Sequence, residues 1–216
     1  IRHGYDYKRI IPPLIPNHKG TWVKVTHLYH VVQDYDIVVL LDGDAYITDP
    51  RMDIEFLMKR WNFTKASSIL MASDPGGPDN QDSKGRATAN WGFVIARNTN
   101  LTKAILKNLS RCVRDIPGCE KWAVTWSYEQ RAFSEYFRDK MKIGSELILA
   151  PCSEANGFAT SNSGCLGTFV THVWTDKPSM VKRFQKLMMD DLMMLLEDKL
   201  WLDKHVSEVV TNDIEK

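Results

Sequence analysis

Apolar positions in this 216-residue chain fall either in short runs or at helical spacing. The short runs predict strands, and a run without polar alternation is typical of a strand that is covered on both faces. These runs are residues 37–41, 69–72, 93–96 and 146–150. Apolar positions at helical spacing predict helices that start near residues 21 and 99 or span residues 53–60, 126–138 and 178–202. Strands alternating with helices indicate an α/β fold with a mainly parallel sheet flanked by helices.

Three of the predicted helices carry an apolar stripe that we expect to face a core. On the first helix the stripe is Trp22, Val25, Tyr29 and Val32. On the helix from residue 99 it is Leu101, Ala104, Ile105, Leu109 and Cys112. On the last helix it is Val181, Phe184, Met188, Leu192 and Leu195, and the methionines there are expected to fill a core. Between the elements, residues 73–89 form a long loop, which is typical of a functional or mobile segment.

The composition is that of a single domain over residues 1–216. Hydrophobic residues make up 44% of the chain, enough to fill one α/β core at this length. Lys and Arg number 28 against 27 Asp and Glu, without long runs of like charge, so no nucleic-acid partner is expected. No apolar run approaches the roughly 18 residues of a membrane span. Because the chain starts at Ile1, we read it as a trimmed or processed piece; if its parent is membrane-anchored, we expect the anchor outside this segment.

Four cysteines form two close pairs, Cys112 with Cys119 and Cys152 with Cys165. Neither pair has the spacing of a zinc site, so two local disulfides are the simplest interpretation, with four buried thiols as the alternative. Asn-x-Ser/Thr sequons favour the same oxidising compartment. They begin at Asn62, Asn100 and Asn108. Together these signals predict the lumen of the secretory pathway.

The segment YDIVVLLDGDAYITDP, residues 35–50, carries the candidate chemistry. Asp42 and Asp44 follow a predicted buried strand, at the sheet edge where α/β folds bind ligands. Their carboxylates can point the same way, and like charges about 4 Å apart repel by about 4 kcal/mol at an effective dielectric of about 20. A divalent cation removes that repulsion, and oxygen ligands favour Mg²⁺ or Mn²⁺. The alternative is a loop with two ordinary turn aspartates.

Other phosphate and metal motifs are absent from the sequence. It contains neither a Gly-x-Gly-x-x-Gly fingerprint nor a Walker loop. A calcium loop is also excluded, because Tyr46 stands where the third ligand belongs. The remaining interpretation is a cation that binds the pyrophosphate of a nucleotide and neutralises charge as that group departs.

Six short segments occur in an order similar to that of a known enzyme family. They are HGYDY (3–7), TWVKV (21–25), LLDGDAYITDP (40–50), NWGFVIARN (90–98), WSYEQRAF (126–133) and THVWTDKP (171–178). Their order resembles the GT-A glycosyltransferases, especially the Golgi galactosyl- and mannosyltransferases grouped with the xyloglucan xylosyltransferases. It is similar, more distantly, to the glycogenin-like transferases.

The resemblance implies a GT-A, Rossmann-like fold whose first strand, the one that holds the nucleotide base, is missing from this chain. It also implies transfer of a hexose or pentose from a nucleotide-diphosphate sugar to a glycan or glycoconjugate acceptor, with retention of configuration. The implied cofactor is Mn²⁺ or Mg²⁺, and the implied compartment is the Golgi lumen. Trp91 stands where the family has a small residue, so we expect it to narrow the sugar pocket.

Roles for single residues follow from the same resemblance. The metal ligands would be Asp42, Asp44 and His172, with Asp42 also meeting the donor. Lys177 and Lys24 would meet phosphate. Asn90 and either Glu129 or Gln130 would address the donor sugar, and Glu129 is the one carboxylate we can name for a covalent retaining route. For these residues, the alternatives are a structural histidine and solvated polar side chains.

The role of His172 requires it to approach Asp42 and Asp44, although 128 residues separate it from Asp44. We expect the β-prone run at residues 168–170 to pair beside the central strand and bring His172 to the same sheet edge. Two other functions remain open from the sequence. One is a nucleotidyltransferase, and the other is a non-catalytic carbohydrate-binding or scaffolding relative of the same fold.

Overall fold

The computed structural model describes residues 3–202, and the chain falls into two compact units, Ile1–Thr175 and Asp176–Lys216. Within residues 3–175, the first unit contains six strands: β1 (Ile37–Leu41), β2 (Ala45–Ile47), β3 (Ile69–Ser73), β4 (Ala89–Arg97), β5 (Leu147–Ala150) and β6 (Val170–His172). Its helices are α1 (Val23–Val31), α2 (Ile54–Arg60), α3 (Asn100–Ser110), α4 (Cys112–Asp115), α5 (Tyr128–Tyr136) and α6 (Cys152–Ala155). The second unit contains α7 (Met180–Leu202) and the preceding 3₁₀ turn Lys177–Ser179.

The main sheet has the strand order β1-β4-β3-β5, and it is not mainly parallel. Strand β4 runs antiparallel to both β1 and β3, whereas β3 and β5 are parallel. The expectation of a mainly parallel sheet is therefore wrong. The apolar runs showed that a strand is covered on both faces of the sheet, but not in which direction it runs. Strand β4 is buried at eight of its nine positions, as a central parallel strand would be. Strand β1 is an edge strand with four partly buried residues and an exposed Leu41.

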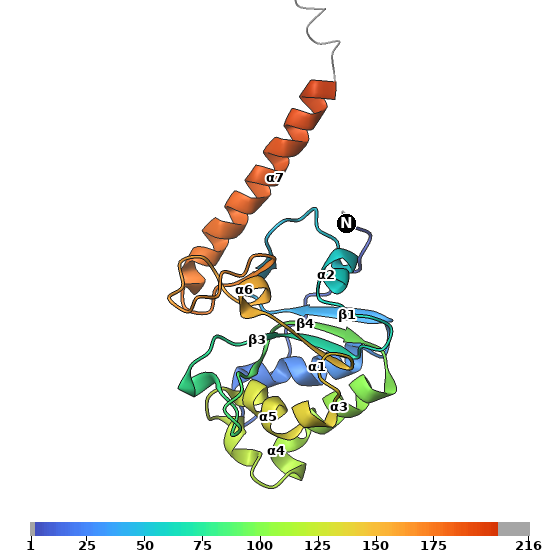
Figure 1. Cartoon of the computed structure of the whole chain (residues 1–216), viewed down its shortest axis with the longest axis vertical. Helices are drawn as coiled ribbons and strands as arrows, with labels where there is room; N and C mark the ends of the chain where they lie inside the picture. The colour runs from blue at the N-terminus through green and yellow to red at the C-terminus, as the bar shows by residue number, and fades with distance from the viewer. Residues whose placement is uncertain (1–2, 203–216) are drawn as a thin grey trace, which may run out of the picture. The chain divides into compact units, whose positions relative to one another are not determined.

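Helices cover both faces of this sheet, giving three layers (Figure 1). Helices α1, α3 and α5 pack on one face, in a core that includes Trp22, Leu106 and Phe133. Helices α2 and α6 pack on the other face, in a core that includes Leu57 and Ala155. The structure is thus the mixed α/β layer fold that the alternation of elements predicts.

A bulge interrupts the pairing of β4 with β3. Met71 pairs with Val94, but the next residue, Ala72, pairs with Asn90, so residues 91–93 of β4 have no counterpart on β3. Because three residues are extra, side chains at odd-numbered positions face one layer before the bulge and the opposite layer after it. Trp91 and Val94 therefore face the same helix layer, although three positions separate them.

A second, two-stranded sheet brings distant segments together. Strand β6 pairs antiparallel with β2, and Ala45 lies opposite His172. We expected the run at residues 168–170 to pair beside the central strand. It pairs instead with the strand that follows the Asp42–Asp44 turn, which places His172 at the same edge by a shorter route.

Local signals fix the ends of two helices. The Asp53 side chain accepts from Phe56 N at the start of α2, and Thr99 accepts from Thr102 N at the start of α3. The buried face of α3 differs from the expected stripe, because Ala104 is exposed and Thr102 is buried. Thr102 can be buried because its hydroxyl donates to Ser68 O.

Both expected disulfides are present, Cys112–Cys119 and Cys152–Cys165. Within residues 3–202, no helix combines the length and apolar character needed to cross a membrane.

The helix predicted over residues 178–202 is present as α7, but its expected core-facing stripe is wrong. The side chains concerned are exposed: Val181, Phe184, Met188, Leu192 and Leu195. Apart from α7, the part of the second unit up to residue 202 contains only a 3₁₀ turn, so no other element within that part covers the stripe.

Candidate functional site

One edge of the main sheet collects the candidate residues. Strands β1, β3 and β5 run in the same direction, so their carboxyl ends lie at one edge, and β4 starts there. Asp42 follows β1, Asp74 follows β3, and Asn90 is the second residue of β4. Open α/β sheets bind ligands at such an edge.

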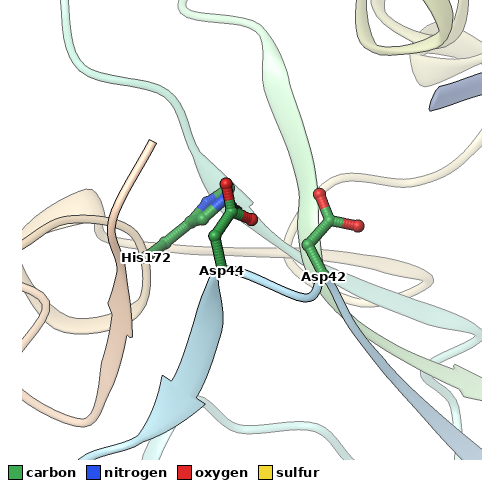
Figure 2. A group of neighbouring side chains, drawn as sticks. All are labelled: Asp42, Asp44 and His172. Atoms are coloured by element: carbon green, nitrogen blue, oxygen red, sulfur yellow. Dashed lines mark ion pairs between the residues drawn. The ribbon is translucent and has the colours of Figure 1, made fainter. Parts of the chain in front are cut away.

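Asp42, Asp44 and His172 converge there from β1, β2 and β6 (Figure 2). Each offers one ligand atom, and these atoms lie within 4.8 Å of one another. His172 Nε2 lies 3.2 Å from Asp44 Oδ1. Among residues 3–202 this is the one group of three or more His, Cys, Asp or Glu side chains with that geometry. The expected approach of His172 to the two aspartates is confirmed, and the chain contains a candidate metal-binding cluster.

Backbone bonds hold the three ligand-bearing segments. Asp42 N donates to Gly92 O at 2.9 Å, which ties the end of β1 to the bulge of β4. Ala45 N donates to Asp42 O at 3.0 Å and closes the tight turn between the two aspartates. Val173 N donates to Asp44 O at 2.8 Å and extends the pairing of β2 with β6. The carboxylates and the imidazole are therefore placed by regular structure and its direct extensions.

The surroundings of the buried His172 ring determine which of its two nitrogens carries the hydrogen. Asn156 Nδ2 lies 3.1 Å from Ser73 O, a backbone carbonyl that can only accept, so the amide nitrogen of Asn156 must face Ser73. The amide oxygen of Asn156, Oδ1, is therefore the atom that lies 2.9 Å from His172 Nδ1. In the neutral ring, Nδ1 then carries the hydrogen and Nε2 carries the lone pair. Two acceptors, Nε2 and Asp44 Oδ1, thus face each other, and a cation or a proton between them would stabilise the pair.

A divalent cation fits this donor set. Two carboxylates and one neutral imidazole nitrogen are ligands that Mn²⁺ accepts, and the carboxylates also suit Mg²⁺. The second nitrogen of the imidazole has a hydrogen-bond partner, as metal-binding histidines usually require.

Gly92 is required for this approach of His172. A Cβ at position 92 would lie 2.2 Å from His172 Cε1, 2.4 Å from Nδ1 and 2.9 Å from Asn90 Oδ1. These distances are far below van der Waals contact, so any side chain there would displace the imidazole. The bulge of β4 and the missing side chain of Gly92 together make room for the ring.

Lys24 links two carboxylates on the other side of Asp42. Its Nζ donates to Asp42 Oδ1 at 3.0 Å and Oδ2 at 2.8 Å, and it lies 3.3 Å from Glu129 Oε1. Thr21 donates its hydroxyl to Glu129 Oε2. The predicted phosphate-binding lysine is thus an ion-pair partner of Asp42. Glu129 is only 1% exposed, and both of its carboxylate oxygens are engaged by neighbouring side chains.

The charges of this trio are coupled. Burial lowers the pKa of the Lys24 ammonium, but Glu129 and Asp42 outweigh burial and raise that pKa above its ordinary value, so Lys24 stays protonated. Burial raises the pKa of Glu129, although Lys24 and Thr21 oppose the shift.

Asn90 and Gln130 lie together on a third side of the site. Asn90 Nδ2 donates to Asp74 Oδ1 at 2.7 Å, and Gln130 Nε2 donates to Asp74 Oδ2 at 2.9 Å. Burial raises the pKa of Asp74, and hydrogen bonds from Thr88, Asn90 and Asn156 oppose the shift. The structure therefore joins the two predicted sugar-binding amides through a carboxylate that the sequence had not suggested.

Two other expectations have different outcomes. Trp91 does not narrow this site: its side chain is fully buried among the helices and packs edge-on against Phe133 at 5.8 Å between ring centroids. Side chains alternate along a strand, so Asn90 and Gly92 face the site while Trp91 faces away. Lys177 lies in the second unit, which is described separately from the unit that carries the other residues.

Three residues of the site were missed from the sequence, namely Thr21, Asp74 and Asn156. Asp74 had a usable signal, because it follows the buried run at residues 69–72 as Asp42 follows the run at residues 37–41. Asn156 lies in a Gly- and Ser-rich stretch that gives no such signal.

Comparisons with known proteins bear on the fold. No protein-family model matches the chain, and no curated protein matches it. Among solved structures, it is similar to the crystal structure of a glycosyltransferase involved in the glycosylation of the major capsid of PBCV-1. The TM-score is 0.60 at 17% sequence identity, and the alignment covers 87% of this chain and 85% of that chain. The chain thus shares its fold with a glycosyltransferase.

Proposed function

We propose that this chain is a metal-dependent glycosyltransferase that moves a hexose or pentose from a nucleotide-diphosphate sugar to a glycan or glycoconjugate acceptor. The observation that carries the proposal is the convergence of Asp42, Asp44 and His172 within 4.8 Å at the ligand-binding edge of the sheet. The shared fold with the glycosyltransferase of PBCV-1 capsid modification supports it.

The cofactor we propose is Mn²⁺, with Mg²⁺ as the alternative. It would be held by Asp42, Asp44 and His172, and when bound it would supply a positive charge for the pyrophosphate leaving group. Lys24 holds the Asp42 carboxylate with two hydrogen bonds, which restricts its rotation before any ligand arrives. Each Asp42 oxygen can accept more than one bond, so Lys24 and a cation can share the carboxylate.

The donor sugar would lie beside Asn90 and Gln130. Each of their amide groups donates one N–H to Asp74 and retains a second N–H for a sugar hydroxyl. We keep retention of configuration as part of the proposal. Because Glu129 is buried and bound to Lys24 and Thr21, this conformation favours a front-face route over a covalent route through Glu129. Lys177 would meet a phosphate of the donor.

The proposed compartment is the Golgi lumen. Two disulfides fit an oxidising compartment of the secretory pathway. Exposed asparagines in all three sequons are consistent with the same compartment.

The test is release of nucleotide from a panel of UDP- and GDP-sugars, with Mn²⁺, with Mg²⁺ and with chelator. We expect release of the free nucleoside diphosphate with at least one donor, and loss of that release on chelation. Release of the sugar 1-phosphate, with the nucleoside monophosphate left on the acceptor, would indicate nucleotidyl transfer, because attack on the α-phosphate breaks its link to the β-phosphate. Mn²⁺-dependent binding of a nucleotide sugar without turnover, with or without glycan acceptors, would indicate a non-catalytic relative.

A further inference from the structure

The carboxylate of Asp74 lies at the junction of the candidate metal cluster and the candidate sugar-binding amides. It is only 7% exposed. Its Oδ1 accepts from Asn90 Nδ2 at 2.7 Å and from Asn156 Nδ2 at 3.2 Å. Its Oδ2 accepts from Thr88 Oγ1 at 2.7 Å and from Gln130 Nε2 at 2.9 Å. A carboxylate offers about four lone-pair sites, so these four donors fill its capacity.

Three of the four donors are carboxamides, and donation to Asp74 turns their oxygens outward. Each oxygen then engages a different part of the site. The contacts are Asn90 Oδ1 with Gly92 N at 2.6 Å, Gln130 Oε1 with Trp91 N at 3.3 Å, and Asn156 Oδ1 with His172 Nδ1 at 2.9 Å. Two amides therefore hold the backbone of the β4 bulge, and the third holds the imidazole.

The orientation of these amides is required by hydrogen-bond chemistry. An ionised carboxylate can only accept, so every amide group that faces Asp74 must present its nitrogen. For Asn156, the carbonyl of Ser73 imposes the same choice independently. The amide oxygen of Asn156 consequently faces His172 Nδ1, and the lone pair of Nε2 faces Asp44.

We propose that Asp74 is a positioning residue that aligns both halves of the site: it orients Asn90 and Gln130 for the donor sugar and, through Asn156, sets His172 with Nε2 toward the cation. The proposal rests on the proposed function for the identity of the ligands. The alignment itself consists of hydrogen bonds that the chain makes within itself. Buried polar groups that are fully hydrogen-bonded in this way are costly to disturb, because each lost contact leaves a buried donor unpaired.

The tautomer of His172 tests the alignment directly and needs no ligand. We expect two-bond ¹H–¹⁵N correlation spectra of histidine-labelled, metal-free protein in alkaline buffer to show hydrogen on Nδ1 of His172. The His172→Gln variant identifies the signal among the six histidines. Hydrogen on Nε2 in the wild-type protein would overturn the proposal, because Nδ1 would then have no hydrogen to donate to Asn156 Oδ1.

Variants separate the two halves. Asn156→Ala should shift His172 to the Nε2–H tautomer and weaken the binding of Mn²⁺ alone by about 10- to 100-fold, the usual cost of losing a group that orients a metal ligand. It should leave the side-chain amide signals of Asn90 and Gln130 in place. Asp74→Ala should move those amide signals and also shift the His172 tautomer in part, because Ser73 O still holds Asn156.

Thr88→Val is the matched control, because it removes one donor to Asp74 and touches none of the three amides. It should keep the wild-type tautomer and Mn²⁺ affinity. The proposal fails if both Asn156→Ala and Asp74→Ala fold, by circular dichroism, and keep the wild-type tautomer. If either variant does not fold, the wild-type spectrum still decides. A wild-type Nδ1–H signal without any Mn²⁺-dependent nucleotide binding would instead count against the proposed function alone.

Discussion

The two sides of Asp42 differ in how their charges are balanced. On one side, Lys24 bridges Asp42 and Glu129, so the protein supplies its own cation. On the other side, Asp44 Oδ1 faces His172 Nε2, and in the neutral ring both atoms are acceptors. The first arrangement is stable as it stands, whereas the second is stabilised by a proton or a cation. Under the proposed function, the Lys24 side serves the fold and the Asp44 side serves the cation.

Substitutions on the two sides of Asp42 should therefore affect different properties, folding stability on one side and cation binding on the other. Changes on the Lys24 side should affect mainly folding stability, because they break an ion pair that the folded chain contains. Changes on the Asp44 side should affect mainly cation binding, because Asp44 Oδ1 and the lone pair of His172 Nε2 are both ligand atoms for the proposed cation.

Replacing Asp44 by Asn should have the largest effect on binding. We expect saturable Mn²⁺-dependent nucleotide binding to be lost, beyond about 100-fold in affinity, with nucleotide release abolished, because a carboxylate ligand is removed. The free energy of unfolding should stay unchanged or rise, since the amide can donate to His172 Nε2. Calorimetric titration measures the affinity for Mn²⁺, and chemical denaturation measures the free energy of unfolding.

The control is Asp53→Asn, at the cap of α2, which should change neither quantity. Retention of wild-type Mn²⁺ affinity by Asp44→Asn would end the metal-site interpretation.

Replacing Lys24 by Met should lower the free energy of unfolding by about 3 kcal/mol, the lower end for breaking a buried ion pair. Glu129 and Asp42 would lose their shared cation, and the loss should be measurable by denaturation in urea. In the double variant with Glu129→Gln, part of the loss should be recovered, because the buried carboxylate is no longer present. Equal stability of the Lys24→Met variant and the wild type would show that the ion pair contributes nothing to the fold.

Replacing Gly92 by Ala should act on the His172 side with a smaller effect. The added Cβ would overlap the imidazole, so Mn²⁺ affinity should fall by about 10- to 100-fold and the free energy of unfolding by about 1–3 kcal/mol. Gly76→Ala is the control, since a Cβ there meets nothing within 4 Å. If Gly92→Ala bound Mn²⁺ like the control, the close packing of His172 on β4 would have no role in binding.

The smallest effect concerns the pH dependence of stability on the Lys24 side. Burial raises the pKa of Glu129 above its ordinary value of 4.5, so its contribution to stability is fully present below that value and is lost as pH rises through the raised pKa. The difference in unfolding free energy between wild type and Glu129→Gln should therefore decrease as pH rises through this window.

Glu135 provides the opposite case for the same measurement. Burial would raise its pKa, but hydrogen bonds from Ser83 and Arg131 hold the pKa below its ordinary value. The difference in unfolding free energy between wild type and Glu135→Gln should therefore increase as pH rises. Slopes of the same sign for both variants would contradict the assignment of burial as the cause at Glu129.

Much of the fold could be predicted because burial leaves a pattern in the sequence. The apolar runs located β1, β3, β4 and β5, and helical spacing located α1, α3 and α7. Strand direction could not be predicted, because an apolar run is the same in either direction. The buried face of α3 was displaced for a related reason: Thr102 is buried through its hydrogen bond to Ser68 O, which hydrophobicity does not record.

The site was predicted as far as its residues lie in short segments of recognisable order. Asp42 and Asp44 share one turn, and His172 lies in a segment similar to that of a known family. Asp74 follows the buried run of β3 and could have been found by that position, whereas Asn156 reaches Asp74 only through a three-dimensional contact that no local spacing encodes. The burial of Glu129 was not predicted either, because its ion pair with Lys24 joins residues 105 positions apart.

The bulge of β4 has a consequence for tracing distant relatives of this chain. Residues 91–93 have no counterpart on β3, so the inward and outward phase of the strand changes within a single continuous segment. A sequence alignment without gaps assumes that side chains alternate between the two faces of the sheet in the same way along the whole strand. Such an alignment would match core positions on one side of the bulge to site positions on the other. Relatives with a shorter or longer bulge would then lose similarity in sequence while conserving the sheet. Searches should therefore anchor Asn90–Gly92 and Val94–Arg97 as two separate blocks with a variable spacer.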